Sequence, residues 1–234
     1  LKVRGSIKAA DEIRLSAGGT EVPDRVSIET YGTSRLAPTQ AGGRIVIRGM
    51  NDVVINSEVG PGSLDLASLE INSQMGDLEI SKESGRLASS GRIQLGGKSV
   101  SLFGKVTSTA TADTAAGFEY SSATPYERDG AAYTPNFDAY EINVGASDTV
   151  TITGTLDLAG SLLVAAGRRV DIYDTTLEVT GSGSQLHIIS DDDLNLGRMA
   201  IASGHDSNPD GQRYQQGGVV RAEAKVHLQA ADLI

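Results

Sequence analysis

The sequence predicts an all-β protein: a right-handed parallel β-helix (β-solenoid) in which each coil of about 20 residues contributes three short strands. Three observations predict this fold. Apolar and polar residues alternate over very short stretches, apolar residues spaced for an amphipathic helix are nearly absent, and successive stretches often begin only six to nine residues apart. Strands of an antiparallel sandwich recur roughly every 8–12 residues. The shorter interval therefore favours stacked coils, as in TITGTLDLAGSLLVAAGRRVDIYDTTLEV (151–179).

Each predicted strand is marked by two apolar residues with one residue between them, which places two side chains on the inner side of the coil. Before residue 108 these pairs are Ile13/Leu15, Val26/Ile28, Ile45/Ile47, Val53/Ile55, Leu64/Leu66, Leu69/Ile71, Leu78/Ile80, Ile93/Leu95 and Val100/Leu102. After residue 141 they are Ile142/Val144, Val150/Ile152, Leu156/Leu158, Leu162/Val164, Val170/Ile172, Leu177/Val179, Leu186/Ile188, Leu194/Leu196, Met199/Ile201 and Val226/Leu228.

Every third strand is expected to stack on its counterpart in the next coil. The spacing predicts that Val150 lies against Val170, Leu156 against Leu177, Leu162 against Leu186 and Ile45 against Leu64. Neighbouring coils lie about 4.8 Å apart, so about ten coils would form a rod on the order of 50 Å long. Right-handed coiling is expected because parallel crossovers have that hand.

The residue between the two inward side chains should face solvent. At most strands it is polar: Arg14, Asp65, Glu70, Glu79, Gln94, Asn143, Thr151, Asp157, Asp171, Glu178 and Asn195. Val46, Val54 and Leu163 are exceptions, apolar on both faces of the strand. They predict a covering loop, segment or partner over those strands; isolated exposed apolar side chains are the alternative.

We expect residues 1–234 to form a single β-helix segment of a longer chain, interrupted by two loops. The insertion at 108–140 lacks alternation, and the polar loop at 203–218 has the sequence SGHDSNPDGQRYQQGG. The insertion holds six of the chain's aromatic residues: Phe118, Tyr120, Tyr126, Tyr133, Phe137 and Tyr140. Two interpretations stay open for it: a cover over one sheet, or a partner- and ligand-binding loop.

Composition excludes several functional classes. The 20 Lys and Arg against 30 Asp and Glu give a net charge of −10, which argues against binding to nucleic acid or to an anionic membrane surface. The absence of Cys excludes disulfides, thiol catalysis and Cys-ligated zinc. The sequence has no apolar run long enough to span a membrane, and we expect no resident cofactor other than calcium.

The calcium prediction rests on the polar loop. Asp206, Asn208 and Asp210 alternate before Gly211, as at the opening of many calcium loops. Water, the carbonyl of Gln212 and an acid from elsewhere in the chain could supply the remaining ligands. Gly217 stands where an EF-hand would carry glutamate. A plain Asn-Pro-Asp-Gly turn is the alternative.

Other polar residues give weaker indications of chemistry. Asp191–Asp193 is expected to be a solvated turn. Asp157 and Glu178 should be neighbours on adjacent coils, either as an acidic ladder or as a carboxylate pair of a glycan-cleaving enzyme. His187, His205 and His227 are far apart in sequence, and no catalytic triad or nucleotide-binding motif is present. The sequence therefore predicts a chain that is not an enzyme.

The units GRIQLGGKSVSLFGKV (91–106) and GTLDLAGSLLVAAGRRVDIYD (154–174) resemble filamentous-haemagglutinin-like β-helices, the shafts of large bacterial surface adhesins and exoproteins. The resemblance covers 1–107 and 141–234. It implies a structural and adhesive shaft at the surface of, or released from, a Gram-negative-type bacterium. We also expect self-association or flanking repeats of the same chain as partners, because the ends of a rod expose unpaired strand edges, and a cell-surface or glycan receptor as a further partner. A glycan lyase or depolymerase and a ligand-binding adhesin tip are the alternatives.

Overall fold

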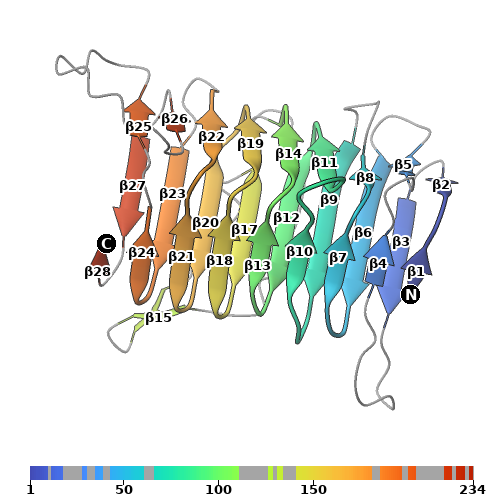
Figure 1. The fold of residues 1–234 in the computed structure, drawn as a ribbon, viewed down its shortest axis with the longest axis horizontal. Coiled ribbons are helices and arrows are strands. Elements are labelled where there is room, and N and C mark those ends of the chain that lie inside the picture. The colour runs from blue at the N-terminus through green and yellow to red at the C-terminus, as the bar shows by residue number, and fades with distance from the viewer. Residues whose placement is uncertain are drawn as a thin grey trace.

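The computed structural model describes residues 1–9, 12–17, 28–30, 35–38, 43–60, 66–110, 126–128, 131–133, 141–180, 185–196, 200–203, 219–222, 225–229 and 232–233. Within these ranges every regular element is a β-strand, and no helix is long and apolar enough to cross a membrane. The strands form three long parallel sheets, which stack along one axis as a right-handed parallel β-helix (Figure 1). The predicted fold class is confirmed.

Sheets A and B each have nine strands in the described part of the chain, and sheet C has eight. Sheet A consists, in spatial order, of β1 (Lys2–Val3), β4 (Ile28–Thr30), β7 (Val53–Ile55), β10 (Leu78–Ile80), β13 (Val100–Leu102), β18 (Thr149–Ile152), β21 (Arg169–Ile172), β24 (Asp193–Asn195) and β28 (Asp232–Leu233). Sheet B consists of β2 (Ser6–Ala9), β5 (Arg35–Pro38), β8 (Glu58–Val59), β11 (Arg86–Ser89), β14 (Lys105–Ser108), β19 (Thr155–Leu158), β22 (Thr176–Val179), β26 (Val219–Ala222) and β25 (Ala200–Ser203). Sheet C consists of β27 (Lys225–Gln229), β23 (Gln185–Ser190), β20 (Leu162–Ala166), β17 (Ile142–Ala146), β12 (Arg92–Gly97), β9 (Leu66–Ser73), β6 (Gly43–Gly49) and β3 (Glu12–Ala17).

From β1 to β24 the chain passes from sheet A to B to C in each coil, and after β24 two strands of sheet B, β25 and β26, come before β27 of sheet C. Among the described residues, the eight strands of sheet C mark eight coils. Two features make the eight coils of the described residues fewer than the ten or so predicted. Several coils are longer than 20 residues, as where Leu78 pairs with Val100, and the insertion between β14 and β17 takes up residues without adding a coil. At about 4.8 Å for each step, the stack is about 40 Å long.

The predicted register is confirmed in the C-terminal half of the chain. Val150 pairs with Val170, Leu156 with Leu177 and Leu162 with Leu186. The prediction that Ile45 stacks on Leu64 was wrong, because Ile45 pairs with Leu69. This coil spans 24 residues from Ile45 to Leu69, whereas the apolar spacing suggested 19 residues, from Ile45 to Leu64.

Aliphatic side chains from all three sheets fill the interior. One continuous core cluster runs along the stack from Val3 to Leu194, and most of its members are fully buried. Each inward position repeats from coil to coil, as in the row Leu78, Val100, Val150, Val170 and Leu194 of sheet A. Each coil therefore buries its apolar side chains against its two neighbours, as in other solenoids.

Two strands of sheet B, β11 and β14, have no apolar pair in the sequence. Their second inward position is a serine, Ser89 or Ser108, and both serines are buried. The Ser89 hydroxyl donates to the carbonyl of Gly91 and accepts from its amide, both at 3.1 Å, and Ser108 Oγ accepts from the Ala110 amide at 3.1 Å. The hydroxyls are thus satisfied inside the fold, where an apolar residue was expected.

The corner between sheets A and B is built by stacked glycines. The amides of Gly104 and Gly154 donate to the carbonyls of Ile80 and Leu102 in the preceding coil, at 2.9 and 2.8 Å. A Cβ atom at Gly154 would overlap the carbonyl oxygen of Gly104, and one at Gly104 would overlap that of Gly85. The coils approach so closely here that no side chain fits between them.

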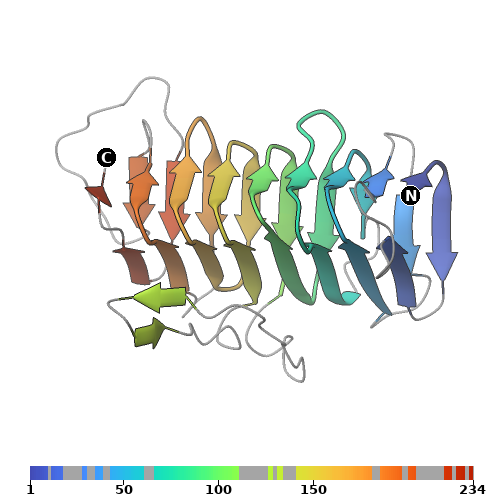
Figure 2. The ribbon, with the colours of Figure 1, turned by 90° about the horizontal axis from the view of Figure 1, so that it is seen from below.

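An antiparallel hairpin, β15 (Tyr126–Arg128) and β16 (Ala131–Tyr133), stands outside the coils. Figure 2 shows it on the outer side of sheet C, beside the C-terminal strands. There Leu163, Ala165 and Ile189 take outward positions yet are buried, and they do not belong to the central core. The burial of Leu163 confirms that its outward side is covered, and both interpretations of the 108–140 insertion stay predictions.

Candidate functional site

The outer face of sheet C divides into two halves of different chemistry. In the C-terminal half the outward residues of β17 and β20 are Asn143, Gly145, Leu163 and Ala165, which are uncharged. In the N-terminal half, β3, β6, β9 and β12 present outward a group that we call the arginine face. Its members are Glu12, Arg14, Ser16, Arg44, Val46, Arg48, Ser68, Glu70, Asn72, Arg92, Gln94 and Gly96. Four arginines against two glutamates give this face a positive charge in a chain of net charge −10.

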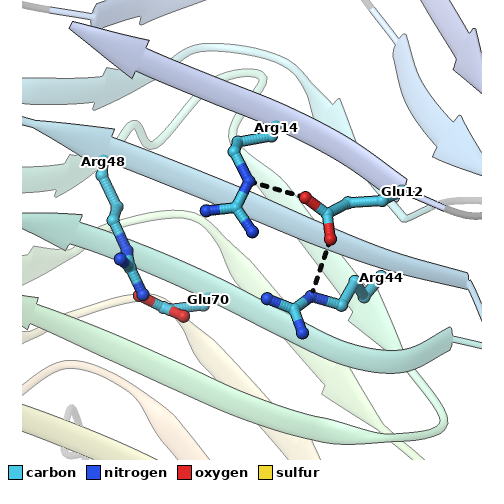
Figure 3. A network of polar contacts seen from close by, with 5 residues as sticks. All are labelled: Glu12, Arg14, Arg44, Arg48 and Glu70. Carbon is cyan, nitrogen blue, oxygen red and sulfur yellow. Dashed lines mark hydrogen bonds and ion pairs between the residues drawn. The ribbon is translucent and has the colours of Figure 1, made fainter. Parts of the chain in front are cut away.

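Ion pairs join neighbouring strands across the arginine face (Figure 3). Glu12 contacts two arginines: Arg14 Nε donates to its Oε1 at 2.6 Å, and Arg44 Nε lies 3.3 Å from its Oε2. Arg48 Nε donates to Glu70 Oε1 at 2.7 Å. Because Glu12 lies on β3, Arg44 and Arg48 on β6 and Glu70 on β9, the pairs link three successive coils.

Val46 lies in the middle of these charged side chains. It sits between Arg44 and Arg48 on its own strand, and between Arg14 and Glu70 on the neighbouring strands. Val46 is buried although it points outward. This placement accounts for its burial, because arginine stems cover apolar neighbours while their charged ends reach solvent. Val54, the third predicted exception, is half-buried.

The ion pairs shift two pKa values. The hydrogen bond from Arg14 lowers the pKa of the Glu12 carboxyl; desolvation opposes this shift, and the charges of Arg14 and Arg44 add to it. The hydrogen bond to Glu70 raises the pKa of Arg48 against a smaller desolvation effect. Both shifts favour the charged forms of Glu12 and Arg48.

Glu12→Gln is expected to lower the free energy of unfolding slightly at neutral pH and to leave it unchanged in acid. A carboxyl whose pKa is lower in the folded chain than in the unfolded chain stabilises the fold above its unfolded pKa. That contribution disappears as the pH falls below about 4.5 and through the lower folded value. Urea unfolding of both proteins from pH 7 to pH 3 checks this prediction, and a difference that stays constant over this range would contradict it.

Sequence reasoning placed Arg14 and Glu70 on the outside but did not find the network. The other members, Glu12, Arg44 and Arg48, flank the apolar pairs at strand ends. Their contacts depend on which residue of β6 lies opposite Glu12, and the actual pairing is Glu12 with Arg44. The predicted stacking of Ile45 on Leu64 shows that spacing alone did not establish the register in this half of the chain.

The predicted calcium ligands Asp206, Asn208, Asp210 and Gln212 lie outside the described residues, as does the polar loop apart from Ser203. In the predicted partner-binding loop, Tyr126 and Tyr133 pair across the hairpin, while Phe118, Tyr120, Phe137 and Tyr140 lie outside the described residues. Calcium binding and ligand binding by the loop therefore stay predictions. The described residues contain no group of three or more His, Asp or Glu side chains arranged to hold a metal ion.

The other candidate residues are brought together in part. Asp157 and Glu178 are register partners in sheet B, as predicted, and Arg221 takes the next position of the same row. His187 and His227, distant in sequence, pair in register in sheet C. Asp192, in the middle of the acidic run, is exposed at a corner as expected, and its amide donates to Arg168 O at 3.1 Å.

Two residues expected at the solvent-facing surface are buried. Asn143 is buried because the outer face of sheet C is covered near β17 and β20. Asp171 points outward, but its carboxylate accepts a hydrogen bond from Arg169 Nε at 2.8 Å, and the longer arginine is much more exposed than the acid. In both cases the predicted direction of the side chain is right and the predicted exposure is wrong.

Comparisons with protein-family models, with curated proteins and with solved structures each return no match.

Proposed function

We propose that this chain is a non-catalytic, structural and adhesive β-helical shaft segment of a large secreted or cell-surface bacterial protein, of the filamentous-haemagglutinin type. The observation that carries the proposal is that the hydrogen-bonded strand pairing of sheets A, B and C continues from coil to coil. The insertion between β14 and β17 leaves them intact, because β14 pairs with β19 across it and β12 pairs with β17. The inward rows also stay aligned from coil to coil. A stack with continuous ladders resists bending, which suits a spacer that holds a binding region away from a surface.

If the shaft is rigid, two spin labels placed far apart along it should be separated by a single, well-defined distance. The chain has no cysteine, so Arg4→Cys with Tyr173→Cys provides two unique spin-label sites, both exposed and at the same corner of the coil. Strands β1 and β21, which precede them, are six steps apart in sheet A, or about 29 Å. Pulsed electron paramagnetic resonance should give a single narrow distribution near that distance.

A shorter pair on another corner serves as the control. Backbone hydrogen bonds connect Lys98 to Asp148, Asp148 to Arg168, and Arg168 to Asp192, each from one coil to the next. Spin labels at Lys98→Cys and Asp192→Cys should therefore lie about 14 Å apart. A broad distribution for the long pair beside a narrow one for the short pair would contradict a stiff shaft. Release of reducing ends from a panel of polysaccharides would contradict the non-catalytic part of the proposal.

A further inference from the structure

Among the ion-paired groups of the arginine face, each arginine side chain is more exposed than the glutamate it contacts, whereas the fourth arginine, Arg92, is buried. The Glu70 side chain is 13% exposed and its partner Arg48 is 45% exposed. Glu12 is 35% exposed, against 48% for Arg14 and 42% for Arg44. A ligand approaching sheet C would meet guanidinium groups before carboxylates.

Hydrogen bonds through Nε orient Arg14 and Arg48, and Arg44 Nε makes an ion-pair contact with Glu12 without hydrogen-bond geometry. All three contacts of Arg14, Arg44 and Arg48 with the glutamates use Nε. In Figure 3 the terminal amino groups of Arg14 and Arg44 point away from Glu12. A guanidinium presents its two terminal nitrogens as a planar fork that matches a carboxylate, and prior orientation by Nε reduces the entropy lost on binding.

The surrounding positions suit a hydroxyl-rich ligand. Ser16 is exposed, Asn72 and Gln94 are half-buried, and the face's one apolar side chain, Val46, is covered. Amides and hydroxyls can both donate to and accept from sugar hydroxyls. An acidic peptide would instead seek an exposed sheet edge or apolar pockets, which the interior strands of a sheet do not offer.

We propose that the arginine face binds a carboxylate-bearing polysaccharide, a uronic-acid polymer, with its carboxylates on Arg14, Arg44 and Arg48. The net charge of −10 repels a dense polyanion such as nucleic acid, whereas uronate charges are separated by neutral hydroxyls. The proposal goes beyond the shaft function, because a spacer requires no ligand along its side. It makes the shaft itself a lateral contact with an acidic glycan.

Binding of the full chain to immobilised polygalacturonate tests the proposal. We expect salt-sensitive binding whose affinity falls about tenfold in Arg14→Gln/Arg44→Gln, because two charge-assisted contacts are lost. The matched control is Arg86→Gln/Lys105→Gln, which removes the same charge from exposed register partners in sheet B and should change the affinity less than about threefold. Arg14→Lys/Arg44→Lys keeps the charge without the fork and should bind with intermediate affinity.

Circular dichroism and thermal melting of each variant establish that it folds. Absence of binding at low salt overturns the proposal, and so does an equal loss of affinity in the sheet B control. Equal binding of neutral dextran would exclude carboxylate recognition. Equal binding of poly-glutamate would exclude the glycan in favour of any acidic polymer.

Discussion

Gly154→Ala is expected to lower the free energy of unfolding by about 3 kcal/mol, a large effect for a single methyl group. The new Cβ would overlap the carbonyl oxygen of Gly104 in the coil below. Relief would require the two coils to move apart. The Gly154 amide would then lose its 2.8 Å hydrogen bond to Leu102 O. The ladder from β13 to β18, which ends directly before this corner, would be strained as well.

Thermal melting and urea unfolding measure this effect. For a chain of this length, about 3 kcal/mol corresponds to a melting temperature lowered by roughly 6–12 °C. Gly104→Ala should behave alike, because its Cβ would meet the carbonyl oxygen of Gly85.

Gly96→Ala is the matched control for the corner glycines. Gly96 lies in β12, and the nearest atom to its new Cβ would be Asn72 Oδ1 at 3.2 Å, the end of a movable side chain. Gly96→Ala should change the free energy of unfolding by no more than about 0.5 kcal/mol. Equal melting of Gly154→Ala and the unsubstituted protein would show that the corner is not closely packed in solution.

The sequence was most informative where both inward positions of a strand are apolar. Pairs such as Leu156/Leu158 and Leu177/Val179 gave the strands of the C-terminal half, and their spacing gave the correct register. Strands β11 and β14 were missed because Ser89 and Ser108 occupy the second inward position. Their hydroxyls are satisfied by nearby backbone groups, so polarity at that position does not report exposure.

The arginine face could not be predicted from alternation alone. Alternation shows which side of a strand faces outward, and it placed Arg14 and Glu70 correctly. The pairing of Glu12 with Arg44 depends on coil length, which varies where connections between strands vary. A register error moves each charge to a different neighbour, so the electrostatics of a solenoid surface follow only once the coils are aligned.

Leu156→Ala is expected to destabilise the chain by about 3 kcal/mol, within the range for truncating a fully buried leucine. Leu156 is completely buried and stacks between Val106 of the preceding coil and Leu177 of the next. All three belong to the continuous core. Removal of its side chain would leave a cavity, which the backbone ladders on both sides prevent from closing.

The effect should be confined along the stack, because each coil contacts only its neighbours. Hydrogen exchange measures this directly: amides of β14, β19 and β22 should exchange faster in Leu156→Ala, while those of β6 and β7 keep their protection. Asp157→Ala is the control, since Asp157 is exposed on the same strand and its removal should cost less than about 0.5 kcal/mol. Uniformly faster exchange from β6 to β22 would mean that the coils unfold as a single unit, and the nearest-neighbour description of this rod would then be wrong.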